Sequence, residues 1–309
     1  MAPFGIAIHG GAGDPGLVLG AYGEDATHGR LQDALAAGYN VLERDGGSVE
    51  AAMAAVQVLE DAEMFNAGRG SVFGSDGACE LDASIMDGAT LAAGAVAGLR
   101  HIRNPICLAH DVMRRSNHVF LIGSGAEKFA ADLGYEVVPN DYFQTKLRRR
   151  QWEDSRKNPT VNPAKGYYGT VGCVALDRAG NLAAGTSTGG NSNKKWGRVG
   201  DSPIIGAGNY ANNRTCGVSA TGYGEFFIRT SAAYDISAQI EYGRRSLGAS
   251  VQCTLEKIGW LGGSGGIIAV SPDGRVAIRL NAGAMWHGYK FSDGRIGAGL
   301  LQKPELDLG

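Results

Sequence analysis

The chain has 309 residues, of which 44% are hydrophobic and 19% are charged. This composition supplies enough apolar material for a core and excludes a wholly disordered chain. Lys and Arg together number 29 against 31 Asp and Glu, a net charge of −2, so composition offers no general attraction for nucleic acid or for an anionic membrane. We therefore expect a folded protein with neither of these partners.

Cysteine and histidine spacing narrows the class of protein further. The five cysteines include no CxxC pair and the six histidines show no close ligand spacing, so neither a disulfide framework nor a transition-metal site is predicted. The sequence contains no secretory leader pattern and no run of about 18 apolar residues. We expect a soluble, cytoplasmic protein.

The first half of the chain predicts strands and helices of ordinary length. In chain order these are a buried strand Phe4–His9 running into a glycine loop, helices Ala26–Leu42 and Ser48–Leu59, a hairpin of Leu81–Met86 with Gly94–Leu99, and helices Pro105–Arg115 and Gly125–Leu133.

Residues 141–166 differ in character from what precedes them. Basic side chains lie among Gln, Asn, Pro159 and Pro163 with few apolar residues, which predicts an exposed linker. Glu153 and Asp154 interrupt the basic run, and no aromatic residues alternate with it regularly. A solvated linker is therefore favoured over a nucleic-acid-binding arm.

The second half returns to regular structure. We expect a hairpin of Thr170–Leu176 with Leu182–Thr188, helices Glu225–Tyr242 and Ser246–Ile258, and a further hairpin of Ile267–Val270 with Val276–Leu280. Two helix-rich parts and two sets of short apolar strands predict an α+β fold in which sheets are packed between helices.

Two common enzyme classes are not supported by the glycine-rich segments. The His9–Gly13 sequence HGGAG resembles the oxyanion loop of α/β-hydrolases, but the chain has no GxSxG nucleophile motif. Gly262–Gly266 lacks the Lys-Ser/Thr ending of a phosphate loop, and HGGAG is not GxGxxG. Neither a serine hydrolase nor a nucleotide-binding protein is indicated.

Seven motifs in order carry a resemblance to a known family. They are HGGAG (9–13), FNAGRGSVF (65–73), DASIMDG (82–88), GYYGTVG (166–172), TSTGG (186–190), GRVGDSP (197–203) and ATGYGE (220–225). With these motifs the chain resembles the plant-type L-asparaginase and isoaspartyl aminopeptidase (β-aspartyl peptidase) family of N-terminal nucleophile hydrolases. The resemblance implies hydrolysis of β-aspartyl amides, in asparagine or isoaspartyl dipeptides, with release of L-aspartate.

The resemblance also implies a fold and a processing event. The expected fold is a four-layer αββα sandwich formed by a single domain, residues 1–309. Self-cleavage between Gly169 and Thr170 would give an α subunit, residues 1–169 with a flexible linker at about 141–169, and a β subunit, residues 170–309. The expected assembly is a dimer of such αβ units.

Thr170 has a chemical rationale as the nucleophile. An N-terminal threonine supplies a hydroxyl and an α-amine whose pKa of about 7.7 to 8.0 suits a general base near neutral pH. The upstream linker could be strained into the turn that an N-to-O acyl shift requires. Taken alone, Thr170 is also compatible with an ordinary β-branched strand residue; the accompanying motifs favour the nucleophile.

Four further residues receive catalytic roles from the resemblance. Thr188 orients the nucleophile, and Asn66 assists self-cleavage. Thr221 and Gly222 form the oxyanion hole, for which a plain turn is the alternative.

Arg198 and Asp201 are predicted to bind substrate. They lie three residues apart in a glycine-rich loop, and an aspartyl substrate offers a carboxylate to Arg and an ammonium to Asp. The alternative is a surface salt bridge between the two side chains.

The resemblance implies a structural sodium ion and no organic cofactor. Backbone carbonyls would hold the ion, and carbonyl ligands leave almost no side-chain signature. A plain loop is the alternative. The implied ligands are the carbonyls of Leu59, Glu60, Ala62, Phe65, Ala67 and Arg69.

Some features leave the substrate and even the activity open. The segment Asn281–Met285, followed by Trp286 and His287, departs from the family pattern where the leaving group would be contacted. Trp196 would either shape the entrance or pack on the surface. A glycosylasparaginase, a taspase-like endopeptidase and an uncleaved, inactive binding protein are alternative functions.

Overall fold

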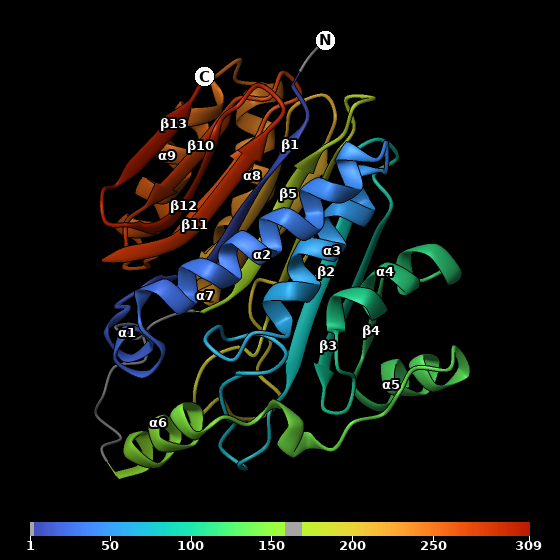
Figure 1. The fold of residues 1–309 in the computed structure, drawn as a ribbon, viewed down its shortest axis with the longest axis vertical. Coiled ribbons are helices and arrows are strands. Elements are labelled where there is room, and N and C mark those ends of the chain that lie inside the picture. Colours follow the sequence, from blue (N-terminus) through green and yellow to red (C-terminus); the bar gives the residue numbers. More distant parts are fainter. Residues whose placement is uncertain (1–2, 158–168) are drawn as a thin grey trace.

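The computed structural model describes residues 3–157 and 169–309. Within them, one large mixed sheet has the strand order β12-β11-β1-β5-β6-β2-β3-β4 (Figure 1). Its strands are β1 (Gly5–Gly13), β2 (Leu81–Asp87), β3 (Ala93–Leu99), β4 (Phe120–Ile122), β5 (Val171–Leu176), β6 (Leu182–Thr188), β11 (Ala284–Phe291) and β12 (Ile296–Leu301).

A smaller antiparallel sheet packs against one face of the large sheet. Its order is β13-β10-β9-β8-β7, with β7 (Asn209–Asn212), β8 (Cys216–Gly222), β9 (Gly265–Val270), β10 (Val276–Leu280) and β13 (Glu305–Leu308). Val174 and Leu182 of the large sheet share one buried cluster with Ile268 and Ile278 of the small sheet. The two sheets therefore enclose a common apolar core.

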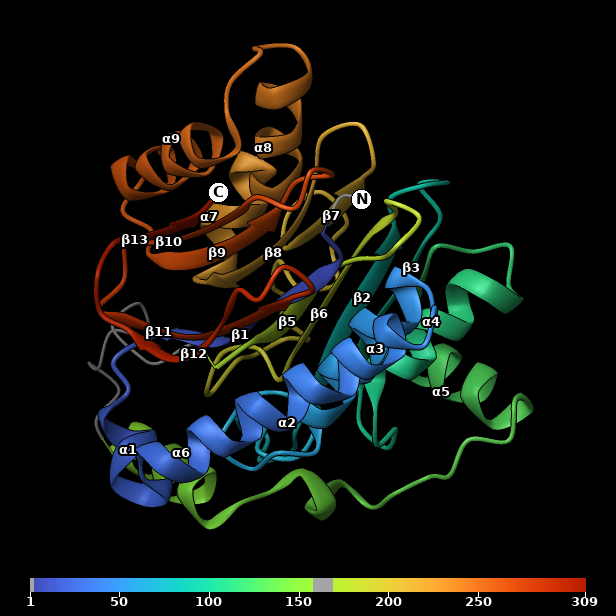
Figure 2. The same cartoon turned by 45° about the horizontal axis from the view of Figure 1, so that its top comes forward.

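Helices cover the two outward faces of this pair of sheets, as Figure 2 shows. The large sheet is covered by α2 (Glu24–Glu43), α3 (Ser48–Glu60), α4 (Pro105–Arg115) and α5 (Gly123–Asp132), and the small sheet by α7 (Gly224–Thr230), α8 (Ala232–Glu241) and α9 (Leu247–Trp260). Three further elements, α1 (Gly16–Tyr22), the 3₁₀-helix Asn140–Phe143 and α6 (Lys146–Lys157), lie at the periphery.

The central strand β5 is apolar throughout because both of its faces are buried. In β5, Val171 and Cys173 point toward the helices, whereas Val174 and Leu176 point into the space between the sheets. Alternate residues of a strand face opposite sides, so a strand covered on both sides shows no polar alternation. This explains why the sequence predicts this strand as a short apolar run.

The expectation of an α+β fold is confirmed, and the three predicted hairpins are present as antiparallel pairs β2–β3, β5–β6 and β9–β10. The predicted helix Glu225–Tyr242 is wrong as a single element. Ser231 adopts a left-handed conformation with φ of 47° and separates α7 from α8. The predicted glycine loop after His9 is also wrong, because β1 continues to Gly13 across a bulge.

The predicted exposed linker needs a larger correction. Its first part contains Phe143, which is buried, and the helix α6, in which Arg148 is only 1% exposed. Trp152 of α6 stacks on Phe73 with ring centroids 5.6 Å apart. A few large side chains therefore anchor a segment that is polar on average; the remainder of the predicted linker, residues 158–168, lies outside the described residues.

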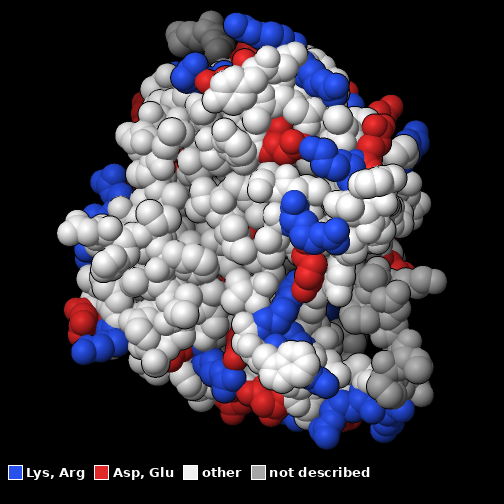
Figure 3. Space-filling model, turned by 180° about the vertical axis from the view of Figure 1, so that it is seen from behind, with Lys and Arg blue, Asp and Glu red and all other residues white. Residues whose placement is uncertain are grey.

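One face of the molecule shows how its charged side chains are arranged. On the face in Figure 3, Lys and Arg are interspersed with Asp and Glu around broad areas that carry neither, as the nearly balanced composition leads one to expect. Among the helices of residues 3–157 and 169–309, none is long and apolar enough to span a membrane.

Candidate active site

The β5–β6 hairpin brings Thr170 and Thr188 together. Val171 pairs with Ser187 in the antiparallel register, which places the preceding Thr170 opposite the following Thr188. Their hydroxyl oxygens lie 3.0 Å apart. Because the Gly190 N–H donates to Thr188 Oγ1 at 3.0 Å, the Thr188 hydroxyl has an acceptor position filled and can direct its own proton toward Thr170.

The His9 side chain is hydrogen-bonded to the backbone carbonyl of Thr170. Its Nδ1 lies 3.0 Å from Thr170 O and its Nε2 lies 2.8 Å from Ser219 Oγ. A carbonyl only accepts, so Nδ1 carries the proton and Nε2 accepts from Ser219. Burial lowers the pKa of His9 to about 3, and the ring is therefore neutral at neutral pH.

Asn66 connects the loop after α3 to Gly169, at the predicted cleavage site, and to the residues that follow β6. Its backbone N–H donates to Gly169 O at 2.8 Å, and its carbonyl accepts from Gly189 N at 2.9 Å. Its side-chain amide donates to Gly190 O at 2.7 Å and accepts from Val72 N at 2.9 Å. The carbonyl of the predicted scissile bond thus already has a fixed backbone donor.

Thr221 and Gly222 reach the site from the other sheet, where they end β8. Both are buried, and Gly222 lines the same pocket as Thr170 and Thr188. Gly222 pairs with Gly265 of β9, and a side chain at position 222 would collide with Ser264 O and Phe227. The close approach of backbones explains the need for glycine at this end of the strand.

Arg198 and Asp201 line the pocket but do not form the surface salt bridge considered as an alternative. Arg198 instead donates from Nε and Nη2 to the two carboxylate oxygens of Glu225, at 2.9 and 2.8 Å. Asp201 is buried, and its Oδ2 has no hydrogen-bond partner within the described residues. A buried carboxylate oxygen without a partner is costly, and a cationic group in the pocket would offset that cost.

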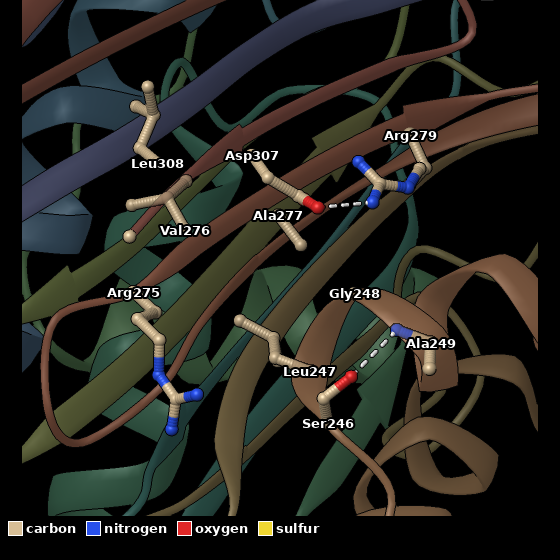
Figure 4. Close-up of a pocket in the computed structure, with 11 residues that line it drawn as sticks. Ser246, Leu247, Gly248, Ala249, Arg275, Val276, Ala277, Arg279, Asp307 and Leu308 are labelled. Carbon is tan, nitrogen blue, oxygen red and sulfur yellow. Dashed lines mark hydrogen bonds and ion pairs between the residues drawn. The ribbon is translucent and has the colours of Figure 1, made fainter.

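The pocket that joins these residues is small and includes Thr170, Thr188, Arg198, Asp201 and Gly222 in its wall. A larger pocket lies at the N-terminal end of α9 and contains none of the predicted site residues. Figure 4 shows Arg279 in that larger pocket joined to Asp307. Chemistry, and not volume, therefore identifies the smaller pocket as the candidate site.

Asp201 gives the protein an expected pH dependence of stability. Burial raises the pKa of Asp201 from 3.8 to about 7, against the lowering influence of Arg198 and alongside the raising influence of Glu225 and Asp82. Between these two pH values the unfolded chain has lost a proton that the folded chain keeps, so the free energy of unfolding falls as pH rises, and this contribution levels off above about 7. Asp201→Asn should remove this component.

Urea unfolding from acidic to neutral pH measures this effect best in a Thr170→Ala background, where a single chain is expected. Asp273→Asn, at an exposed position, is the control that should retain the slope. Parallel pH profiles of Asp201→Asn and its parent would contradict the assignment.

The loop after α3 presents backbone carbonyls, as the sodium expectation requires. Ala62 N–H donates to Leu59 O at 3.3 Å and Phe65 N–H to Ala62 O at 3.4 Å, which indicates tight turns. Arg69 N–H donates to Glu60 O at 2.7 Å and closes the loop on itself. Each of these three carbonyls has a second lone pair, and carbonyl oxygens are suitable ligands for a hard cation.

The segment Asn281–Met285 and Trp286, which departs from the family pattern, contains residues that are buried or are hydrogen-bonded next to the end of β8. Met285 and Trp286 of β11 are fully buried, while the Asn281 side chain accepts from Gly265 N at 2.8 Å, beside Gly222. Trp196 is 97% exposed and lies in the loop between Asn191 and Arg198, both of which line the pocket.

Sequence reasoning missed three contributors to this site. Glu225 lies within the ATGYGE motif but its pairing with Arg198 joins residues 27 apart. Lys194, a buried side chain, donates to Gly189 O at 3.0 Å, and His9, which received no role from the sequence, contacts Thr170 O. A buried polar residue in an apolar strand, as His9 is, was the available signal.

Comparison with known proteins agrees with this geometry. The model of the family described as asparaginase matches residues 1–298. An isoaspartyl peptidase from Salmonella typhimurium is 45% identical to the chain, and the alignment covers 93% of this chain and 95% of that protein. An isoaspartyl peptidase from Escherichia coli is 46% identical, with 93% of this chain and 92% of that protein covered. A probable isoaspartyl peptidase/L-asparaginase from Arabidopsis thaliana is 39% identical, covering 95% of this chain and 98% of that protein. The chain belongs to the asparaginase family, and the resemblance seen in the motifs is confirmed.

Proposed function

We propose that the chain is an isoaspartyl peptidase/L-asparaginase, a threonine hydrolase that cleaves β-aspartyl amide bonds and releases L-aspartate. The names of relatives at 39% to 46% identity support the reaction class. The observation that carries the proposal is the 3.0 Å contact between the Thr170 and Thr188 hydroxyls, in a pocket that also holds Arg198 and Asp201. The substrate is a small molecule that carries an amino-acid head group.

Self-cleavage is the first step of the proposed mechanism. Thr170 Oγ attacks the carbonyl carbon of Gly169, the peptide C–N bond breaks, and the chain passes through an ester that water hydrolyses. The Asn66 N–H, 2.8 Å from Gly169 O, stabilises negative charge on that oxygen. The products are the 1–169 and 170–309 subunits, the second of which begins with a free α-amine.

Substrate hydrolysis then uses the same hydroxyl. Thr170 Oγ attacks the β-carbonyl carbon and its proton passes to the α-amine, which delivers it to the departing amine. Thr221 Oγ1 and Gly222 N–H donate to the oxyanion. Water, deprotonated by the same amine, attacks the resulting ester and releases aspartate.

The loop after α3 is proposed to hold a structural sodium ion through the carbonyls of Leu59, Glu60, Ala62, Phe65, Ala67 and Arg69. The ion would supply fixed positive charge and rigidity to the loop that carries Asn66. Replacing NaCl by choline chloride at equal ionic strength should then lower the melting temperature, since a ligand bound only by the folded state stabilises it. An unchanged melting temperature would argue against a resident ion.

The fold, assembly and compartment complete the proposal. The sheets and their covering helices support a four-layer αββα sandwich of the N-terminal nucleophile type in one domain, assembled as a dimer of αβ units. All five cysteines are free, as expected in a reducing cytoplasm.

Substrate binding by Arg198 and Asp201 can be separated from self-cleavage. Arg198→Lys keeps the charge but loses the planar fork, and Asp201→Asn removes the countercharge for the substrate ammonium. Each should lower kcat/KM by about 10- to 10²-fold, the value of a hydrogen bond to a charged group, while cleavage at Gly169 proceeds. The exposed pair Arg275 and Asp273 provides matched controls, Arg275→Lys and Asp273→Asn. A kcat/KM equal to that of the parent would contradict the binding role.

A panel of β-aspartyl dipeptides, asparagine, a glycosylated asparagine and a folded protein tests the function itself. Release of aspartate from dipeptides or asparagine is the expected result. Preference for the glycosylated substrate would favour a glycosylasparaginase. Cleavage of a folded protein would favour a taspase-like endopeptidase. A chain that stays whole and turns over no substrate would be an inactive homologue.

A further inference from the structure

Arg148 is a buried arginine in the first turn of the basic helix α6, whose other residues are exposed or partly buried. It is 1% exposed, and its guanidinium donates from Nε to Gly70 O at 2.7 Å, from Nη2 to Met64 O at 3.3 Å and from Nη1 to Gln151 Oε1 at 3.0 Å. A buried charge is costly unless it is hydrogen-bonded, so this placement of α6 depends on the two loop carbonyls. In Figure 1, α6 lies next to the loop that follows α3.

Phe143, shortly before α6, also forms a hydrogen bond with Gly70 of this loop. The Gly70 N–H donates to Phe143 O at 2.9 Å, and Gly70 has a φ of 109°, a conformation open to glycine. The segment from Phe143 to Arg148 therefore binds both the N–H and the carbonyl of Gly70. This segment fixes one end of the loop.

Asn66 lies within the loop that is held in this way, between Met64 and Gly70. Its N–H donates to Gly169 O, the carbonyl oxygen of the bond that the proposed self-cleavage breaks. The chain thus leaves the loop at Arg148 and comes back to it at Gly169. Because Arg148 and Gly169 are both hydrogen-bonded to this loop, less entropy is lost in presenting the scissile bond to the Thr170 hydroxyl.

We propose that Arg148 is a positioning residue for self-cleavage, acting through Met64 and Gly70 to hold the Asn66 N–H against the carbonyl of Gly169. The inference rests on the proposed self-cleavage at Gly169. It assigns to the linker helix a role in maturation, because the helix braces the loop that polarises the scissile carbonyl. Displacement of a reacting group by about 1 Å can cost about 10²-fold in rate, so loss of the guanidinium should slow cleavage strongly.

The test follows cleavage of the full chain made by cell-free synthesis, with the fraction of cut chain read from a denaturing gel over time. Arg148→Met keeps most of the side-chain volume but removes the donors, and should slow cleavage by about 10- to 10²-fold. Arg148→Lys keeps a charge and should cleave at an intermediate rate. Arg150→Met changes an arginine on the same helix that is 85% exposed, and should cleave as the parent does.

A second comparison separates positioning from general stability. Melting temperatures are measured in the Thr170→Ala background, with Val251→Ala as a destabilising change in the distant core beneath α9. Arg148→Met should cleave far more slowly than Val251→Ala at a comparable loss of melting temperature. Equal slowing of both variants, or parental cleavage by Arg148→Met, overturns the role of Arg148. A parent chain that stays whole would instead contradict self-cleavage itself.

Discussion

Thr170→Ala should yield one full-length chain with no hydrolase activity, whereas the parent yields two chains that end and begin at the Gly169–Thr170 bond. Alanine keeps the backbone and the strand but removes the hydroxyl that both proposed reactions use. The hydroxyl lies 3.0 Å from Thr188 Oγ1, and its neighbour Gly169 O accepts from Asn66. A denaturing gel with intact-mass measurement reads the first outcome, and an aspartate-release assay reads the second.

The matched variant is Thr170→Ser, which retains a hydroxyl and should still cleave and turn over substrate, at a lower rate. The methyl group of threonine restricts rotation about χ1, so serine holds the oxygen less firmly toward Thr188. A single-chain Thr170→Ala protein with parental activity would eliminate the mechanism.

Thr221→Val should lower kcat by about 10²- to 10³-fold, the usual effect of losing one oxyanion-hole donor. Valine has nearly the shape of threonine and suits the buried end of β8, so the loss isolates the hydroxyl. KM should change little, because the donor acts on charge that develops only in the transition state.

Thr215→Val is the control for this substitution. Thr215 is also buried and precedes β8, but its hydroxyl lies 2.6 Å from Ser237 Oγ beneath the helices. It should affect stability and leave kcat within about twofold of the parent. A parental kcat in fully cleaved Thr221→Val would assign the oxyanion to other donors.

Local sequence was sufficient to predict most of the central strands and hairpins. The hairpins β5–β6 and β9–β10 were predictable because short apolar runs separated by turns such as Pro272-Asp-Gly274 have few other solutions. The site residues Thr170, Thr188, Arg198 and Asp201 were named from motif order, and the structure places all four around one pocket.

Elements whose stability comes from distant contacts were not predictable. The linker sequence is polar on average, yet α6 is held by Arg148 on Gly70 and by Trp152 on Phe73, contacts about 80 residues apart in the chain. Similarly, the left-handed Ser231 divides the predicted helix Glu225–Tyr242 into α7 and α8, and helical periodicity does not encode that break.

The sequence by itself determined the α+β class and the family, and it singled out Thr170 as the proposed nucleophile, because these depend on residue type, order and short-range periodicity. The tertiary structure decided which groups meet. It pairs Arg198 with Glu225 and brings His9 into hydrogen-bond contact with the carbonyl of Thr170. It buries Asp201, whose Oδ2 has no hydrogen-bond partner among the described residues. Hydrogen bonds and desolvation act over a few ångströms in space, and only the folding of two sheets against each other brings these residues within that range.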